Sequence, residues 1–213
     1  MSEGEPLIGD GVTQGIVRIG DTVRRPLRPF SLTVQAYLAH LRDAGFTGAP
    51  LPLGVDEQGR EILSFVPGDV PRNPLPAEMA GDVVFRAGLP VALIDFDIAH
   101  PTTRLYDIAN ALWCWAPLRA PQDRAPAFAG VDTPHRIAVF AHAYGMTARH
   151  RAELAPFAID MARRYHEDSR DSAELDPVYR KLWEDGAKDE LPRAEAWLRE
   201  AGPVITARLT QRD

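Results

Sequence analysis

The spacing of hydrophobic residues changes once along the chain and divides it into two parts. Up to Ile94 the apolar residues come in short runs separated by glycine-containing turns, a pattern typical of strands and hairpins. From Leu105 onward they recur every three or four residues, which is typical of amphipathic helices. The pattern therefore predicts an α+β protein with a β-rich first part and a helical second part.

The first part is expected to contain three hairpins and one helix. Gly20-Asp21 and the glycine at position 59 lie between apolar runs, where a tight turn is needed. The helix has apolar residues on one face, and Ser31 stands where a capping hydroxyl is common. The predicted elements are a hairpin over 16–23, a helix over 31–44, and hairpins over 54–66 and 83–94.

The helical second part is expected to begin after Pro101. Thr102 or Thr103 can cap its first helix, whose apolar residues recur at helical spacing as far as Trp113. A second helix should end at Gly145, and further apolar stripes predict several more helices before the C-terminus. These stripes are interpreted as core positions.

Composition limits the class of protein. The 213 residues include 45% hydrophobic and 25% charged residues, and 24 basic against 30 acidic residues give a net charge of −6. This balance gives no indication of nucleic-acid binding. The acidic N-terminus has no signal-peptide pattern and no apolar run is long enough to cross a bilayer, so a cytoplasmic protein without membrane contact is expected. The single cysteine, Cys114, excludes an internal disulfide and is interpreted as a packing residue.

Two carboxylates follow directly after a short apolar run. Residues 91–94 have the pattern of a buried strand, and Asp95 and Asp97 come at its end. A strand end holds carboxylate oxygens rigidly, and Mg²⁺ binds such oxygens together with phosphate oxygens. The turn is therefore a candidate metal site.

This segment, IDFDIAHPTTRLYDIANALW, resembles the metal-binding segment of the aminoglycoside phosphotransferase and choline kinase-like family, which has the protein-kinase fold. The family carries I-D-F-[DEG] and then R-x-x-D-[LI]-A. Asp95 matches the metal-binding aspartate, with Asp97 as a possible second ligand, and Arg104 and Asp107 match the later pair, whose role is mainly structural. The resemblance implies a shortened, two-lobed kinase-like fold. Its parts would be a β-rich lobe over 1–68, a hinge over 69–82 and a mainly helical lobe over 83–213.

The resemblance also implies ATP, or another nucleoside triphosphate, and Mg²⁺ as cofactors. Glycine-rich loops lie close to phosphates, basic residues on the next strand contact them, and hinge backbone binds adenine. The strand offers arginine instead of lysine, and the helix has Gln35 where the kinase template has a glutamate. The matching positions are Gly9, Gly11 and Gly15 in the loop, Arg24 and Arg25 on the strand, and Ser64, Phe65 and Val66 at the hinge.

The catalytic loop of the family, H-[GN]-D-L-x-x-x-N, has no match. The stretch between Pro76 and Val83 is too short for this loop and the two helices that precede it, so roughly sixty residues are missing by the size of an ordinary domain. Asp82 is the remaining candidate for the catalytic base, although the histidine, leucine and asparagine of the motif are absent. Loss of a general base costs about 10²- to 10⁴-fold in rate.

Three functions remain open. The chain could keep the family chemistry, phosphoryl transfer to a hydroxyl of a small molecule, in impaired form. It could be a pseudokinase or interaction module, in which the missing helices leave apolar surface that a homodimer covers. It could also be a shortened copy of an active phosphotransferase.

Overall fold

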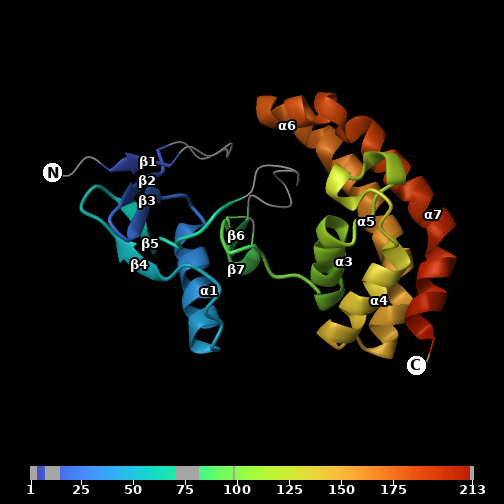
Figure 1. Ribbon diagram of the computed structural model, residues 1–213. Helices are drawn as coiled ribbons and strands as arrows, with labels where there is room; N and C mark the ends of the chain where they lie inside the picture. The colour runs from blue at the N-terminus through green and yellow to red at the C-terminus, as the bar shows by residue number, and fades with distance from the viewer. Residues whose placement is uncertain (1–3, 8–14, 71–81, 98, 212–213) are drawn as a thin grey trace. The chain divides into compact units, whose positions relative to one another are not determined.

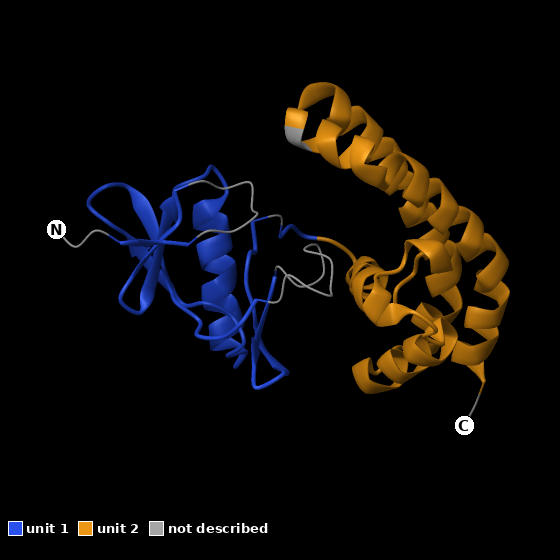
Figure 2. Ribbon diagram, turned by 45° about the horizontal axis from the view of Figure 1, so that its top comes forward, with its two compact units in different colours: residues 1–101 blue, residues 102–213 orange. Residues whose placement is uncertain are grey.

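The computed structural model of the protein describes residues 4–7, 15–70, 82–97 and 99–211. It separates into two compact units, residues 1–101 and residues 102–213, which Figure 2 colours differently. Among the described residues, the first unit contains the strands and one helix, and the second contains helices alone. The α+β class predicted from the hydrophobic spacing is confirmed.

Unit 1 is built on a five-stranded antiparallel sheet with the order β1-β2-β3-β5-β4 (Figure 1). The β2–β3 connection is a tight turn at Gly20, whose φ of +60° favours glycine. The predicted hairpins over 16–23 and 54–66 are therefore present. The strands are β1 (Glu5–Pro6), β2 (Val17–Ile19), β3 (Thr22–Pro26), β4 (Pro52–Val55) and β5 (Arg60–Ser64).

Helix α1 (Ser31–Asp43) follows β3 and packs through Val34 and Leu38 against Leu63 of β5. The helix prediction is confirmed, but the predicted cap is wrong. Phe30 occupies the N-cap position, and Ser31 is buried, with its Oγ directed to a carboxylate of the sheet. A capping hydroxyl accepts from an N–H of the first helical turn, whereas Ser31 Oγ accepts from Arg28 N at 3.0 Å, before the helix begins.

The hairpin of β6 (Val83–Arg86) and β7 (Leu89–Leu93) also belongs to unit 1. Asp69 and Phe85 exchange backbone hydrogen bonds of 2.8 Å, and Leu93 N donates to Gly48 O at 2.8 Å. These bonds tie the hairpin to the region around the sheet. The units divide after Pro101, whereas the resemblance to the kinase-like family implies that the hairpin belongs to the helical lobe and that the boundary lies over 69–82.

Unit 2 is a bundle in which the long helices α5 and α7 lie side by side (Figure 1). Thr103 caps α3 by accepting from Tyr106 N, and Gly145 ends α4 with φ +71°, as the sequence predicted. No described helix combines the length and apolarity needed to cross a membrane. The helices are α3 (Arg104–Trp115), α4 (Thr133–Tyr144), α5 (Ala148–Leu175), α6 (Pro177–Leu182) and α7 (Lys188–Thr210), with short turns η1 (Pro121–Asp123), η2 (Pro126–Phe128) and η3 (Trp183–Ala187).

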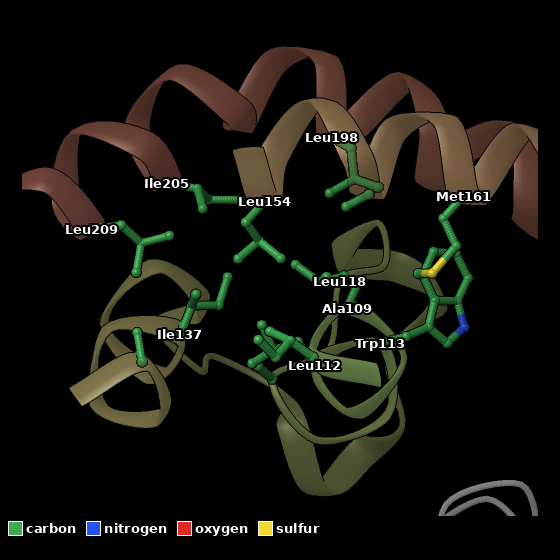
Figure 3. Packing of buried hydrophobic residues seen from close by; sticks show 14 of the residues in the cluster. Ala109, Leu112, Trp113, Leu118, Ile137, Leu154, Met161, Leu198, Ile205 and Leu209 are labelled. Atoms are coloured by element: carbon green, nitrogen blue, oxygen red, sulfur yellow. The ribbon is translucent and has the colours of Figure 1, made fainter. Parts of the chain in front are cut away.

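Apolar side chains from α3, α4, α5 and α7 form the core of unit 2 (Figure 3). One arginine supports it from the helix ends: Arg151 donates to Met146 O at 3.0 Å, to Ala141 O at 3.1 Å and to Leu209 O at 3.2 Å. Ala141 lies near the end of α4 and Leu209 near the end of α7, while Met146 lies just before α5. Arg151 therefore fixes the ends of α4 and α7 to the start of α5.

Candidate functional site

The acidic turn after β7 is fixed to the sheet unit by its middle residue. Phe96 packs against the α1 core, and its ring meets that of Tyr37 edge-on with centroids 6.1 Å apart. Asp95 and Asp97 flank this contact in the sequence. Asp95 has φ +60°, a conformation that residues other than glycine adopt at a cost of about 1 to 3 kcal/mol. Such backbone strain is typical of functional turns.

Three carboxylates converge at this turn. Partial burial and the nearby charge of Asp97 raise the pKa of Asp95, against the opposing effect of Arg25. Asp82 lies close enough to Asp95 for their charges to interact, and desolvation together with this charge raises the pKa of Asp82 to about 6. The two chain segments are joined here, since Ile94 N donates to Asp82 O at 2.8 Å. The turn is therefore a region of concentrated negative charge.

Arg25 is the positive charge that faces this turn. Its Nη1 lies 2.6 Å from Asp97 Oδ1 and 4.0 Å from Asp95 Oδ1. The contact between Arg25 and Asp97 is an ion pair, but its geometry is not that of a hydrogen bond. Asp97 Oδ1 is therefore buried without a hydrogen-bond partner. Asp95 is the more exposed of the two aspartates, with 56% of its side chain accessible against 19% for Asp97.

Arg24, the other basic candidate, does not face the acidic turn and contacts other residues. Successive residues of a strand point to opposite faces, so Arg24 and Arg25 diverge. Arg24 donates to Thr22 Oγ1 and lies 3.5 Å from Asp56 Oδ2. Of the two arginines, Arg25 is therefore the one that the structure brings to the acidic turn.

The three hinge candidates differ in the availability of their backbone. Ser64 N donates to Leu51 O at 2.9 Å and Phe65 N donates to Asp21 O at 2.8 Å, so both amides are used inside the sheet. The N–H of Val66 has no acceptor among the described residues. Val66 is thus the one of these three candidates whose amide makes no hydrogen bond within the described part of the chain.

The remaining candidates are only partly located. Gly9 and Gly11 lie outside the described residues, while Gly15 precedes β2 with φ +80°. Arg104 and Asp107 are exposed in the first turn of α3, in the other unit from the acidic turn. The structure therefore brings together Asp82, Asp95, Asp97 and Arg25.

The donor set at the turn is compatible with Mg²⁺ bound together with phosphate. Within the described ranges no group of three or more histidine, cysteine, aspartate or glutamate side chains is arranged to hold a metal. Mg²⁺ in nucleotide sites, however, commonly uses one or two carboxylates plus phosphate oxygens and water. Asp95 supplies an exposed carboxylate, and partial burial together with the nearby charge of Asp97 raises its pKa, an effect that a bound cation would oppose. A bound Mg²⁺ would neutralise phosphate charge there.

Sequence reasoning missed Glu61, which is wholly buried at the other end of Arg25. Arg25 Nε donates to Glu61 Oε1 across the β3–β5 pair. A signal for this residue was present: side chains two apart on a strand share a face, so Glu61 lies on the same face as the buried Leu63. A glutamate on a buried strand face requires a charged partner.

Comparison with known proteins gives one distant similarity. The trifolitoxin immunity protein of Rhizobium leguminosarum bv. trifolii is 25% identical to this chain over 238 residues, which include 83% of this chain and 90% of that protein. No family model matches the chain, and no solved structure matches it.

This chain has fewer residues than the length of the alignment. Because 83% of 213 residues is about 177, about 61 of the 238 aligned positions (238 − 177), in total, have no residue here. The chain is therefore shorter than its relative within the region that the two share.

Proposed function

We propose that this chain is a kinase-like nucleotide-binding protein, related to the aminoglycoside phosphotransferases, whose phosphoryl transfer is impaired. The observation that carries the proposal is the acidic turn: a strained Asp95 at a strand end, facing Arg25 of β3. In kinases a basic residue on the third strand and an aspartate that binds Mg²⁺ hold the nucleotide phosphates. Here strand, basic residue, helix and acidic turn come in the same order.

Two further observations support this proposal. Val66, whose amide has no acceptor among the described residues, lies two residues after the end of β5, where the kinase template has its adenine-binding hinge. The chain also lacks about 61 of the positions aligned with the trifolitoxin immunity protein (238 − 177), a total close to the roughly sixty residues that the resemblance expects to be missing. Both fit a kinase-like chain that has lost its catalytic loop.

The phosphoryl transfer is expected to be impaired because the catalytic base lies outside its usual motif and the second metal ligand is missing from that motif. Among the described residues, Asp82 is an aspartate that interacts with Asp95 and precedes it in the chain, as a kinase base does, but the sequence has no asparagine at the spacing of the family motif. With a pKa of about 6 it is ionised at neutral pH and is able to accept a proton. Transfer to a hydroxyl of a small molecule would therefore be slow, at a rate limited by this incomplete site.

Thermal unfolding with and without ATP and Mg²⁺ tests the proposal. A ligand that binds the folded chain at a hundred times its Kd stabilises it by about 2.7 kcal/mol. The melting temperature of the native chain and of Asp43→Asn should rise, because Asp43 is exposed at the end of α1. Asp95→Asn should abolish the rise that depends on Mg²⁺. An equal rise for Asp95→Asn would contradict a metal site at this turn.

The similarity to the trifolitoxin immunity protein favours a second candidate, a role in immunity to a toxin. Expression of the chain in a toxin-sensitive bacterium, followed by measurement of survival, tests this role. Protection that is lost in Asp95→Asn would link immunity to nucleotide chemistry. Protection that survives Asp95→Asn would instead favour an interaction module that binds the toxin or its target.

Self-association remains part of the pseudokinase alternative. Large apolar side chains are exposed at the end of α5 and on α6, with Leu175 87% and Leu182 52% accessible. A homodimer would cover such surface. Light scattering at micromolar concentration should then give the mass of a dimer, and a monomer would count against this alternative.

A further inference from the structure

A polar cluster of four side chains lies inside unit 1 and consists of Arg25, Ser31, Gln35 and Glu61. Glu61 is 0% exposed and accepts from Arg25 Nε. Ser31 Oγ donates to Glu61 Oε1 at 3.3 Å, and Gln35 Nε2 donates to Glu61 Oε2 at 3.2 Å. Both carboxylate oxygens are therefore satisfied by donors from β3 and α1. A buried carboxylate is stable only with such partners.

This arrangement fixes the direction of the guanidinium. The Arg25 head is planar, so holding Nε at Glu61 also sets the position of Nη1. Nη1 then lies 2.6 Å from Asp97 and 4.0 Å from Asp95. Arg25 is itself only 8% exposed, which leaves little freedom for another orientation. The result is a continuous series of charges from Glu61 through Arg25 to the acidic turn.

We infer that Glu61 is a positioning residue for the metal-nucleotide site, acting through Arg25 to hold Asp97 and leave Asp95 free for the metal. This inference rests on the proposed function. The α1 residue that contacts Glu61 is the neutral Gln35. The negative charge that pairs with Arg25 inside the unit therefore comes from Glu61 on the neighbouring strand β5 and not from α1. Arg25 is thereby paired with the carboxylates of Glu61 and Asp97, and it supports the turn in addition to the phosphate contact expected of the basic strand residue.

The inference makes a specific claim about magnesium. If Glu61 only stabilised the fold, its substitution would weaken ATP binding equally with and without Mg²⁺. If it positions the turn, substitution would weaken mainly the part of the affinity that depends on Mg²⁺. Loss of groups that orient metal ligands typically costs about 10- to 100-fold in metal affinity.

The test is the ratio of ATP dissociation constants without and with Mg²⁺, measured by calorimetry for each variant. Glu61→Gln keeps the size of the side chain and removes its charge, and it should lower the ratio about tenfold or more. Glu61→Asp should restore part of the loss. Glu57→Gln, in the exposed turn before β5, is the matched control and should leave the ratio unchanged.

A second variant covers the case in which Glu61→Gln does not fold. Arg25→Lys keeps the positive charge against Glu61 but lacks the planar head that reaches Asp97, so it should lower the same ratio. An unchanged ratio in the folded variants, with magnesium-dependent binding by the native chain, would overturn the inference alone. Absence of ATP binding by the native chain would overturn the proposed function and this inference with it.

Discussion

Arg25 Nη1 lies 2.6 Å from Asp97 Oδ1 and joins the third strand of the sheet to the acidic turn after β7. The two residues are far apart in the sequence, yet both belong to unit 1. Since Arg25 is buried, its charge needs this partner as well as Glu61. The ion pair therefore contributes both to the stability of unit 1 and to the geometry of the turn.

Asp97→Asn should destabilise the protein, because the amide keeps the shape but removes the charge that faces Arg25. The expected loss is about 1 to 3 kcal/mol, the usual range for hydrogen-bonded or paired charged groups. Urea unfolding followed by circular dichroism measures it. Asp43→Asn, which changes an exposed aspartate of the same unit, should be nearly neutral. Equal stability of the two variants would show that the Arg25–Asp97 pair contributes nothing.

Gly68→Ala should loosen the attachment of the β6–β7 hairpin. Gly68 has φ +152°, and a Cβ there would lie 2.5 Å from Phe85 O and 2.5 Å from Val84 Cγ1. The contact is with backbone, so the hairpin has to move, and the loss should exceed about 1 kcal/mol.

Gly59→Ala is the control for Gly68→Ala. Gly59 also has positive φ, at +74°, but no atom lies within 4 Å of its would-be Cβ. Comparison of the denaturation midpoints of the two variants separates the cost of a positive φ, which both share, from the cost of a steric clash, which only Gly68→Ala has. A Gly68→Ala midpoint no lower than that of Gly59→Ala would contradict the close approach to Phe85.

The stability of the ligand-free protein should fall as pH rises from about 4 to about 6. Asp82 has a pKa of about 6 in the folded chain against an ordinary value of 3.8, so the folded state holds a proton that the unfolded state releases. This pH dependence is opposite to that of a carboxylate stabilised by a cation, whose contribution to stability grows as pH rises. Asp82→Asn should flatten this part of the stability curve. An identical curve for the variant would show that another group is responsible.

Arg151→Ala should destabilise unit 2 by about 2 to 3 kcal/mol, because three carbonyls lose a charged donor. Its neighbour Arg149 is a natural control, since it makes an exposed pair with Glu153 that is worth little. Arg149→Ala should therefore leave the melting temperature almost unchanged. Similar losses for both variants would contradict the role of Arg151 at the helix ends.

Elements could be predicted from the sequence where the spacing of apolar residues is regular, and pairings across the chain could not. The helix beginning at Ser31 and the hairpin turning at Gly20 follow from local pattern and turn chemistry. The role of Ser31 was missed because it depends on Glu61, a residue on another strand. The local sequence contains no information about the register that places Arg25 opposite Glu61.

The candidate site shows the same division. Asp95 and Asp97 are identifiable because they follow a strand-like run directly. That Asp97 would be paired with Arg25 while Asp95 stays accessible requires the position of β3 relative to the turn. The attachment of the β6–β7 hairpin to unit 1 likewise depends on bonds at Asp69 and Gly48, which the proline-rich stretch before the hairpin gave no reason to expect.

Calorimetric titration of ATP into the native chain, with and without Mg²⁺, tests the central claim most directly. A nucleotide site at the acidic turn predicts saturable binding that Mg²⁺ strengthens, and loss of this strengthening in Asp95→Ala. Such a result would justify a search for hydroxyl acceptors. Absence of binding by the native chain under both conditions would contradict the kinase-like function.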